Sequence, residues 1–273
     1  MKEYTRPKKA YLNTDFIMSR DGRLLRIMSE HLEPESRFEH YDVRDTIVFF
    51  GSARTLPRDQ AAAELEEARR DGGDVAGAEA RLAASRYYED ARALAGRLTT
   101  WSKGLEDPGK RFVVCTGGGP GIMEAANRGA SEARGLNIGL NISLPMEQYG
   151  NPYTTRELTF EFHYFFMRKF WFAYLAKALI VFPGGFGTLD EFFEVMTLIQ
   201  TRKIRKRLPV VLFGKPFWDE VVNFDALIRH GTISSEDLDL FFATDSVDEA
   251  FDHLTRELTT ALLAEPVRRT ELE

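Results

Sequence analysis

Five short runs of mostly apolar, β-branched and aromatic residues recur along the chain, and longer segments with helical periodicity separate them. The runs cover residues 46–50, 112–115, 137–143, 178–182 and 209–213. As a set they lack the strict apolar and polar alternation of strands with one exposed face, which favours strands covered by helices on both faces. Because crossovers between parallel strands are right-handed, the pattern predicts an α/β fold: a doubly wound parallel sheet with helices on both faces.

The segments outside these runs predict the organisation of the rest of the chain. Residues 1–45 are charged with scattered apolar positions, and we expect an N-terminal helical extension that packs on the main domain or on a neighbouring subunit. Residues 46–273 are expected to form one domain. Within it, the Ala-, Glu- and Arg-rich segment 60–102 predicts two exposed helices or a helical hairpin, and the segment after Val247 predicts a closing amphipathic helix.

Glycine-bearing turns follow three of the five predicted strands, at residues 51–53, 116–121 and 183–188. The carboxyl ends of parallel strands meet at one rim of the sheet, where such folds bind their ligands. The second and third turns lead directly into helical patterns, and a glycine turn before a helix start lets backbone N–H groups approach an anion. We therefore expect one phosphorylated ligand contacted by both turns, or a phosphate at one and a sugar or base at the other. The alternative is that these glycines only make tight turns.

Several other classes of ligand and partner fit the sequence poorly. The dinucleotide-binding fingerprint fails at both turns, because its third glycine would fall on Ile122 or on Asp190. The formal charge of −6, from 42 acidic and 36 basic residues, disfavours a nucleic-acid partner. One cysteine, Cys115, and five histidines without ligand spacing indicate no metal site. No signal peptide and no apolar run of roughly 18 residues are present, so we expect a cytoplasmic protein that binds no membrane.

Charged residues near the third turn are the first candidates for catalysis. Thr188 and Glu191 have the spacing of a capping box, which would give Glu191 a structural role only. Asp190 and Glu191 would also lie in the first turn of a helix at the rim, where the helix dipole lowers the pKa of a carboxyl group. A carboxylate kept ionised in this way suits a site that stabilises a developing cation. Arg168 lies among aromatic residues, so its guanidinium must either reach water or meet an anion.

Three segments together carry a family resemblance. GGGPGIMEAANRGA at 117–130, the pair Arg168-Lys169 in an aromatic helix, and PGGFGTLDE at 183–191 resemble the LOG family of nucleotide phosphoribohydrolases, which was historically labelled lysine decarboxylases. The last segment fits the family pattern P-G-G-x-G-T-x-x-E at every fixed position, and the resemblance covers approximately residues 46–244. It implies a Rossmann-like fold, a homodimer or larger homo-oligomer, and hydrolysis of the N-glycosidic bond of AMP or cytokinin riboside 5′-monophosphates to base and ribose 5-phosphate.

The resemblance also implies which residues form the site. Arg168 and Glu191 match the catalytic pair. The matching substrate-binding positions are Gly184, Gly185, Gly187 and Thr188 at the third turn, and Gly117, Gly118, Gly119, Met123 and Glu124 on the other side. Ser52, Gly121 and Lys169 are further candidates for substrate binding. Two of these have local alternatives: Glu124 hydrogen-bonds a sugar hydroxyl or pairs with Arg128, and Ser52 donates to phosphate or forms a turn. No cofactor is implied.

The sequence departs from the plant form of the family in ways that limit the assignment. Residues 165–169 lack the histidine that the plant form places before its Arg-Lys pair, and residues 1–45 have no counterpart in compact members. No lysine is positioned for the Schiff base of pyridoxal phosphate, so decarboxylation is not supported. We hypothesise that Glu191 stabilises an oxocarbenium-like ribosyl cation and orients or deprotonates the attacking water, while Arg168 positions the substrate and Glu191. The alternatives are a non-catalytic nucleotide-binding or sensor protein and an oligomeric scaffold.

Overall fold

The computed structural model describes residues 7–105, 112–144 and 150–263, and in these ranges seven strands form one parallel sheet. Their spatial order is β4-β3-β2-β1-β5-β6-β7, and every neighbouring pair runs parallel. The strands are β1 (Thr46–Phe50), β2 (Val113–Thr116), β3 (Asn137–Ile142), β4 (Thr159–Phe162), β5 (Ala176–Val181), β6 (Val210–Phe213) and β7 (Phe242–Thr244). The predicted doubly wound α/β sheet is confirmed.

All five predicted strands are present, with ends shifted by two residues or fewer. The sequence analysis missed β4 and β7, which are the two edge strands of the sheet. Both are short and each pairs on one side only, so neither needs the long apolar run that marks a central strand.

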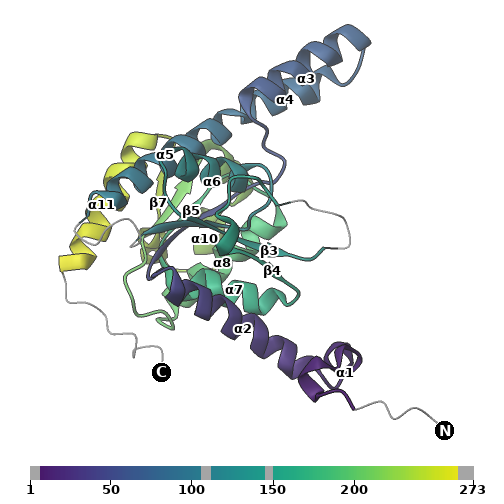
Figure 1. The fold of residues 1–273 in the computed structure, drawn as a ribbon. Helices are drawn as coiled ribbons and strands as arrows, with labels where there is room; N and C mark the ends of the chain where they lie inside the picture. The colour runs from purple at the N-terminus through teal and green to yellow at the C-terminus, as the bar shows by residue number, and fades with distance from the viewer. Residues whose placement is uncertain (1–6, 106–111, 145–149, 264–273) are drawn as a thin grey trace.

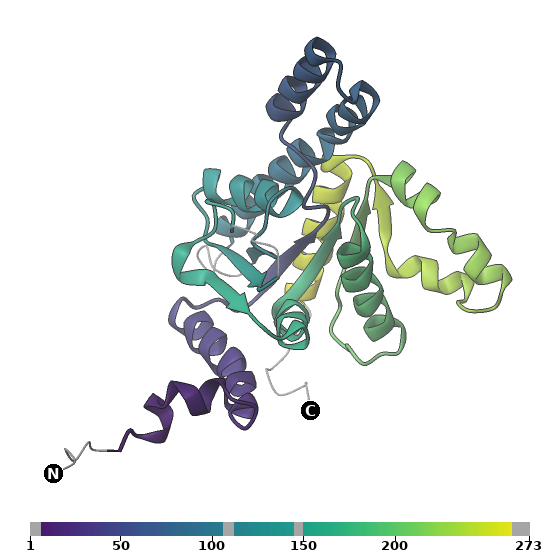
Figure 2. The same ribbon diagram turned by 90° about the vertical axis from the view of Figure 1, so that its right-hand side faces the viewer.

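Helices cover both faces of the sheet (Figures 1 and 2). Helices α5 (Arg86–Lys103), α6 (Ile122–Glu132) and α11 (Val247–Leu263) pack on one face, and α2 (Arg23–His40), α7 (Phe165–Leu175), α8 (Phe186–Gln200) and α9 (Lys215–Val221) pack on the other. In β1, Ile47 and Phe49 enter the first of these cores while Val48 and Phe50 enter the second. A central strand such as β1 is therefore mostly apolar and buried throughout, because its side chains meet a helix layer on either face.

Two helical segments project from this body at opposite ends in Figure 1. Helices α3 (Arg58–Asp71) and α4 (Val75–Ala84) form a hairpin whose turn begins at Gly72, which has a left-handed φ of 71°. The segment 60–102 was predicted to form two helices or a helical hairpin. It contains three helices, because α5 begins two residues after the end of α4. The other projection contains η1 (Ala10–Leu12), α1 (Thr14–Met18) and the first part of α2. The predicted closing helix after Val247 is α11.

The remaining short elements are η2 (Arg156–Leu158), α10 (Phe224–Arg229) and η3 (Ser235–Leu240). Across the described ranges, no helix combines the length and the apolar character that crossing a membrane demands.

The order of the strands places a crevice beside β1. From β1 the chain builds the sheet outward through β2, β3 and β4 on one side and through β5, β6 and β7 on the other. Connections from neighbouring strands diverge at such a switch point, and ligands bind there outside the carboxyl ends of the strands. Two backbone hydrogen bonds join the three glycine turns at this point: Ser52 N–H donates to Pro183 C=O at 2.9 Å, and Ile122 N–H donates to Ser52 C=O at 3.0 Å. The three turns share one rim, as predicted.

Candidate active site

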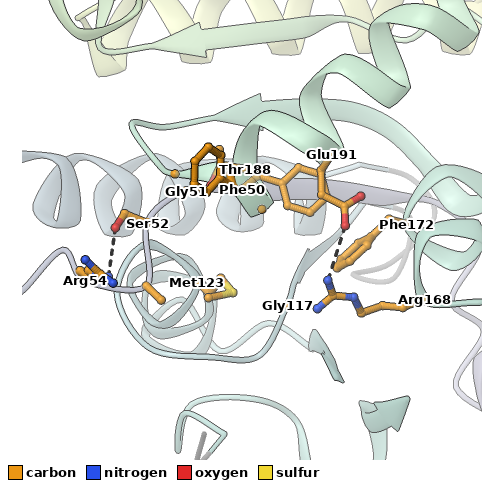
Figure 3. A pocket seen from close by; sticks show the side chains of 14 residues that line it. Phe50, Gly51, Ser52, Arg54, Gly117, Met123, Arg168, Phe172, Thr188 and Glu191 are labelled. Atoms are coloured by element: carbon orange, nitrogen blue, oxygen red, sulfur yellow. Dashed lines mark hydrogen bonds and ion pairs between the residues drawn. The ribbon is translucent and has the colours of Figure 1, made fainter. Parts of the chain in front are cut away.

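A cavity of about 580 Å³ opens at the carboxyl ends of β1, β2 and β5. Its size falls in the usual range for small-molecule sites. It is lined by residues 50–54 after β1, by Gly117 and Met123 around the β2–α6 turn, by Arg168 and Phe172 of α7, and by residues 185–188 and Glu191 around the start of α8. Figure 3 shows Ser52 and Arg54 at one end of this cavity and Arg168 with Glu191 at the other.

Glu191 enters the cavity from the second turn of α8. The helix begins at Phe186, with Gly185 as its N-cap in an extended conformation, so Glu191 is its sixth residue. The sequence analysis placed it in the first turn and paired it with Thr188 in a capping box; both expectations are wrong. The helix starts three residues earlier than predicted because the chain turns within the glycine segment, and the glycine N-cap makes no side-chain capping bond.

The protonation state of Glu191 also differs from the prediction. Its side chain is 7% exposed, and burial raises its pKa from 4.5 to about 7, while the charges of Arg168 and Lys169 act in the opposite direction. Desolvation thus outweighs every favourable charge near the carboxyl group. Around neutral pH the group exists in both the protonated and the ionised form, which is the condition for efficient proton transfer.

Arg168 lies next to Glu191 and is held by aromatic rings. Its Nη2 is 3.6 Å from Glu191 Oε1, and its guanidinium carbon lies 5.2 Å and 5.7 Å from the ring centroids of Phe165 and Phe172. The side chain is 15% exposed, so of the two predicted environments it meets an anion and does not extend into water. Burial lowers the pKa of Arg168, but an arginine keeps its charge at any physiological pH. Its buried Nε has no hydrogen-bond partner in the described part of the chain, which leaves a donor for a ligand.

The start of α8 offers backbone donors to the same cavity. Leu189 N–H is the first amide of this helix that donates to a helical carbonyl, that of Gly185 at 3.0 Å. The amides of residues 186–188 precede it, and amides at these positions have no acceptor within the helix. A Cβ at Gly185 or Gly187 would meet no atom within 4 Å, so both glycines border open space, whereas a Cβ at Gly184 would lie 2.1 Å from Thr188 Oγ1. This arrangement is typical of a site for a phosphate or carboxylate.

The glycines of the β2–α6 turn have a different role. Gly117 lines the cavity, but Gly118, Gly119 and Gly121 do not. Gly118 and Gly121 have φ values of 68° and 71°, and a Cβ at Gly121 would lie 2.2 Å from Ser52 O. These glycines let α6 start directly against the β1 turn, and only Gly117 faces the proposed ligand.

Two predicted substrate-binding residues, Lys169 and Glu124, bond to other side chains of the protein. Lys169 Nζ lies 2.7 Å from Asp190 Oδ2 and 2.9 Å from Glu194 Oε2, so it joins α7 to α8. The Tyr88 hydroxyl donates to Glu124 Oε1 at 2.7 Å. Glu124 is thus bonded to Tyr88, and neither Glu124 nor Lys169 is among the described residues that line the cavity.

A buried polar cluster that the sequence analysis missed holds the β2–α6 turn. Asn127 Oδ1 accepts from the Thr116 hydroxyl at 2.6 Å and from Asn151 Nδ2 at 3.0 Å. Asn151 Nδ2 also donates to Gly119 C=O at 3.0 Å, and Gly118 N–H donates to Thr116 Oγ1 at 2.9 Å. These groups come from separate segments of the chain, so no local motif could have identified them. Arg54 and Phe172 were missed as well, although Phe172 has the helical spacing that puts it on the same face as Arg168.

Comparison with known proteins adds a family to this geometry. The profile of a family described as "Possible lysine decarboxylase" matches residues 123–254, a range that contains both Arg168 and Glu191. Two rice (Oryza sativa subsp. japonica) proteins are similar: a probable cytokinin riboside 5′-monophosphate phosphoribohydrolase, LOGL5, is 32% identical over 126 residues, and the cytokinin riboside 5′-monophosphate phosphoribohydrolase LOG is 29% identical over 150 residues. Over about half of its length, the chain is therefore similar to proteins of the LOG family.

The similarity covers only part of each protein. For LOGL5 it spans 45% of this chain and 49% of the relative, and for LOG it spans 52% and 60%. Among solved structures, the Moco carrier protein from Chlamydomonas reinhardtii is 19% identical with a TM-score of 0.46, over 80% of this chain and 99% of that protein.

The lining of the cavity and the acidic, histidine and cysteine side chains bear on cofactor and metal sites. No lysine is among the described residues that line the cavity, so the cavity does not fit the Schiff base that pyridoxal phosphate requires. In the described ranges, no three His, Cys, Asp or Glu side chains cluster in a way that could hold a metal ion.

Proposed function

We propose that this protein is a cytoplasmic hydrolase that cleaves the N-glycosidic bond of a purine nucleoside 5′-monophosphate. The substrate is AMP, a cytokinin riboside monophosphate, or both, and the products are the free base and ribose 5-phosphate. The observation that carries this proposal is that one cavity contains the Arg168–Glu191 pair and the free amides at the start of α8. The names of the rice relatives, which are phosphoribohydrolases, support the same reaction.

In this proposal the start of α8 binds the 5′-phosphate. The amides of residues 186–188 and the positive end of the helix attract the anion, and Ser52 lies beside them, since its N–H donates to Pro183 C=O. The ribose then extends toward Glu191 at the other end of the cavity. Binding of the phosphate fixes the sugar for reaction, so a nucleoside without phosphate reacts poorly.

The reaction proceeds by departure of the base and attack of water at C1′. The ionised Glu191 stabilises the oxocarbenium-like transition state and accepts a proton from the attacking water, which forms the C1′–OH bond. Arg168 holds the carboxylate at 3.6 Å and supports its ionised form. Arg168 cannot release its own proton at neutral pH, so a water molecule protonates the departing base. The proton that Glu191 accepts then passes to the resulting hydroxide, which balances the reaction.

Chromatography of AMP incubated with the purified protein tests the proposal. We expect adenine and ribose 5-phosphate in equal amounts, with far slower release of adenine from adenosine. Glu191→Gln should bind AMP and lose about two to four orders of magnitude in turnover, as expected for loss of a general base. Glu220→Gln, on the exposed surface of α9, is the control. AMP binding without adenine release would support the nucleotide-binding or sensor alternative, and equal cleavage of adenosine would contradict the role of the phosphate.

We also propose that the chain forms a homodimer or larger homo-oligomer. Large apolar side chains of α2 and α7 are exposed, among them Leu24, Met28, Leu32 and Phe166 at 72%, 56%, 53% and 53%. Contiguous apolar surface of this kind is typical of protein interfaces. In this proposal residues 1–45 are an extension that covers or is covered by a neighbouring subunit. Light scattering should give a mass of at least twice 31.1 kDa, and a monomer at micromolar concentration would contradict it.

A further inference from the structure

Arg54 is a cation of the cavity that forms no ion pair with a carboxylate of the described residues. The guanidinium of Arg168 faces Glu191, and the ammonium of Lys169 lies between two carboxylates of α8. Arg54 lines the opposite end of the cavity, and its side chain has no hydrogen bond or ion pair to the described residues.

The backbone that carries Arg54 is fixed although its side chain is exposed. Arg54 N–H donates to Ser52 Oγ at 3.1 Å, and Ser52 is itself bonded to Pro183 and to Ile122. The next residue, Thr55, is buried. A Cβ at Gly184 would lie 3.0 Å from Ser52 N, so the turn before α8 packs directly against the segment that presents Arg54. The guanidinium therefore extends from a fixed point on the rim, beside the backbone donors that begin α8.

We propose that Arg54 binds the 5′-phosphate of the nucleotide, together with the amides at the start of α8, and thereby selects nucleotides over nucleosides. This inference rests on the proposed function for the identity of the ligand. Backbone amides carry only partial charges, whereas a phosphate monoester carries close to two negative charges at neutral pH. A guanidinium supplies a full positive charge and two parallel donors that match phosphate oxygens.

The placement at this end of the cavity also separates the two negative groups. A phosphate bound between Arg54 and α8 lies away from Glu191, because Arg54 and Glu191 occupy opposite ends of the cavity in Figure 3. Phosphate binding next to Glu191 would instead place like charges together in a buried site. Arg54 thus defines the direction in which the nucleotide lies, with its phosphate at the β1 turn and its glycosidic bond toward α7 and α8.

The test compares Arg54→Gln and Arg54→Lys with the control Arg58→Gln, which removes an exposed arginine at the start of α3. For AMP hydrolysis, we expect Arg54→Gln to raise KM at least tenfold with little change in kcat, Arg54→Lys to recover part of the loss, and Arg58→Gln to behave as wild type. Hydrolysis of adenosine should be unchanged in all three. An unchanged KM for AMP, or equal losses for AMP and adenosine, would overturn the proposal.

Calorimetric titration of AMP separates this inference from the proposed function. If the wild-type protein binds AMP without hydrolysing it, the proposed reaction is contradicted. In that case, an affinity of Arg54→Gln for AMP that is ten times weaker than that of the wild type still supports the role of Arg54. Equal binding of AMP by wild type and Arg54→Gln, or no binding by either, overturns the role of Arg54. Thermal unfolding of each variant, expected to match wild type, shows that the binding loss does not come from unfolding.

Discussion

We compare the free energy of unfolding of Glu191→Gln with that of the wild type at different pH values. The difference in favour of the variant should be larger at pH 8 than at pH 5. Burial raises the pKa of Glu191 from 4.5 to about 7 in the folded protein. Between these values the folded state holds a proton that the unfolded chain has released, so the free energy of unfolding falls as the pH rises. The stabilisation from the protonated group is complete below about pH 4.5 and is lost as the pH passes 7. Glutamine stays neutral, and the variant has no such loss.

The size of the effect follows from the two pKa values. Each pKa unit corresponds to about 1.4 kcal/mol, and the two titration curves together give a change of roughly 2 to 3 kcal/mol between pH 5 and pH 8. That is a large fraction of the typical stability of a folded domain, about 5 to 15 kcal/mol. The effect is measured as a difference in the free energy of unfolding between two proteins. Other groups that titrate in this range, such as His253, contribute almost equally to both proteins, so their contributions cancel to first order.

Urea unfolding of the two proteins at pH 5, 6, 7 and 8 measures the effect, with equal protein concentration and ionic strength. Tryptophan fluorescence can follow the transition, because Trp171 and Trp218 are buried in the core beside α7 and α8. Glu220→Gln is the control and should show no pH-dependent difference from wild type. A wild-type minus Glu191→Gln difference that is constant within about 0.5 kcal/mol, or that changes with the opposite sign, would refute a buried carboxyl group of raised pKa and the catalytic role built on it.

Three further predictions concern the groups around Glu191. Arg168→Gln removes the charge that lowers the pKa of Glu191, so the pH at which kcat/KM rises should increase by about one unit. An unchanged pH profile would show that Arg168 does not influence the ionisation of Glu191. Gly121→Ala should cost at least about 2 kcal/mol in urea unfolding, whereas Gly72→Ala, with the same φ of 71° but open space around it, should cost about 1 kcal/mol; equal costs would exclude a contact with the β1 turn. Asn151→Ala removes three side-chain hydrogen bonds, two of which hold the glycine turn, and we expect a loss of about 1 to 3 kcal/mol in stability and a rise in KM for AMP that exceeds any fall in kcat, both measured on the same preparation.

The central part of the fold could be predicted because its signal is contained in each strand. A strand such as β1 packs against a helix layer on both faces, so all five of its residues are buried and four of them, residues 47–50, are apolar. Edge strands such as β4 and β7 lack this requirement, and they went unpredicted. The hairpin of α3 and α4 shows the same limit, since its composition predicts exposed helices but not where each begins and ends.

The location of the site could also be predicted, but the state of its main residue could not. Glycine turns after parallel strands must share a rim, and this topological rule alone brings Gly117, Gly185 and Ser52 together. The pKa of Glu191 depends on what covers it, namely α7 and the cavity wall, which no spacing along the sequence specifies. The Asn127–Asn151 pair shows the same limit, because it joins residues from α6 and from the loop before η2.

A carboxyl group whose ionised form is disfavoured in the free protein can still be an effective catalyst for the proposed reaction. Catalysis depends on interactions that are stronger in the transition state than in the ground state. A buried carboxylate has few solvent molecules to stabilise it, so it gains more from a positive charge that develops on the ribose than an exposed carboxylate would. Arg168 keeps the ionised form accessible. In the proposed orientation of the nucleotide, a phosphate at the Arg54 end adds little repulsion, since Arg54 and Glu191 lie at opposite ends of the cavity. The burial of Glu191 that lowers the stability of the protein above pH 7 is therefore the same feature that increases its electrostatic effect on a ribosyl cation.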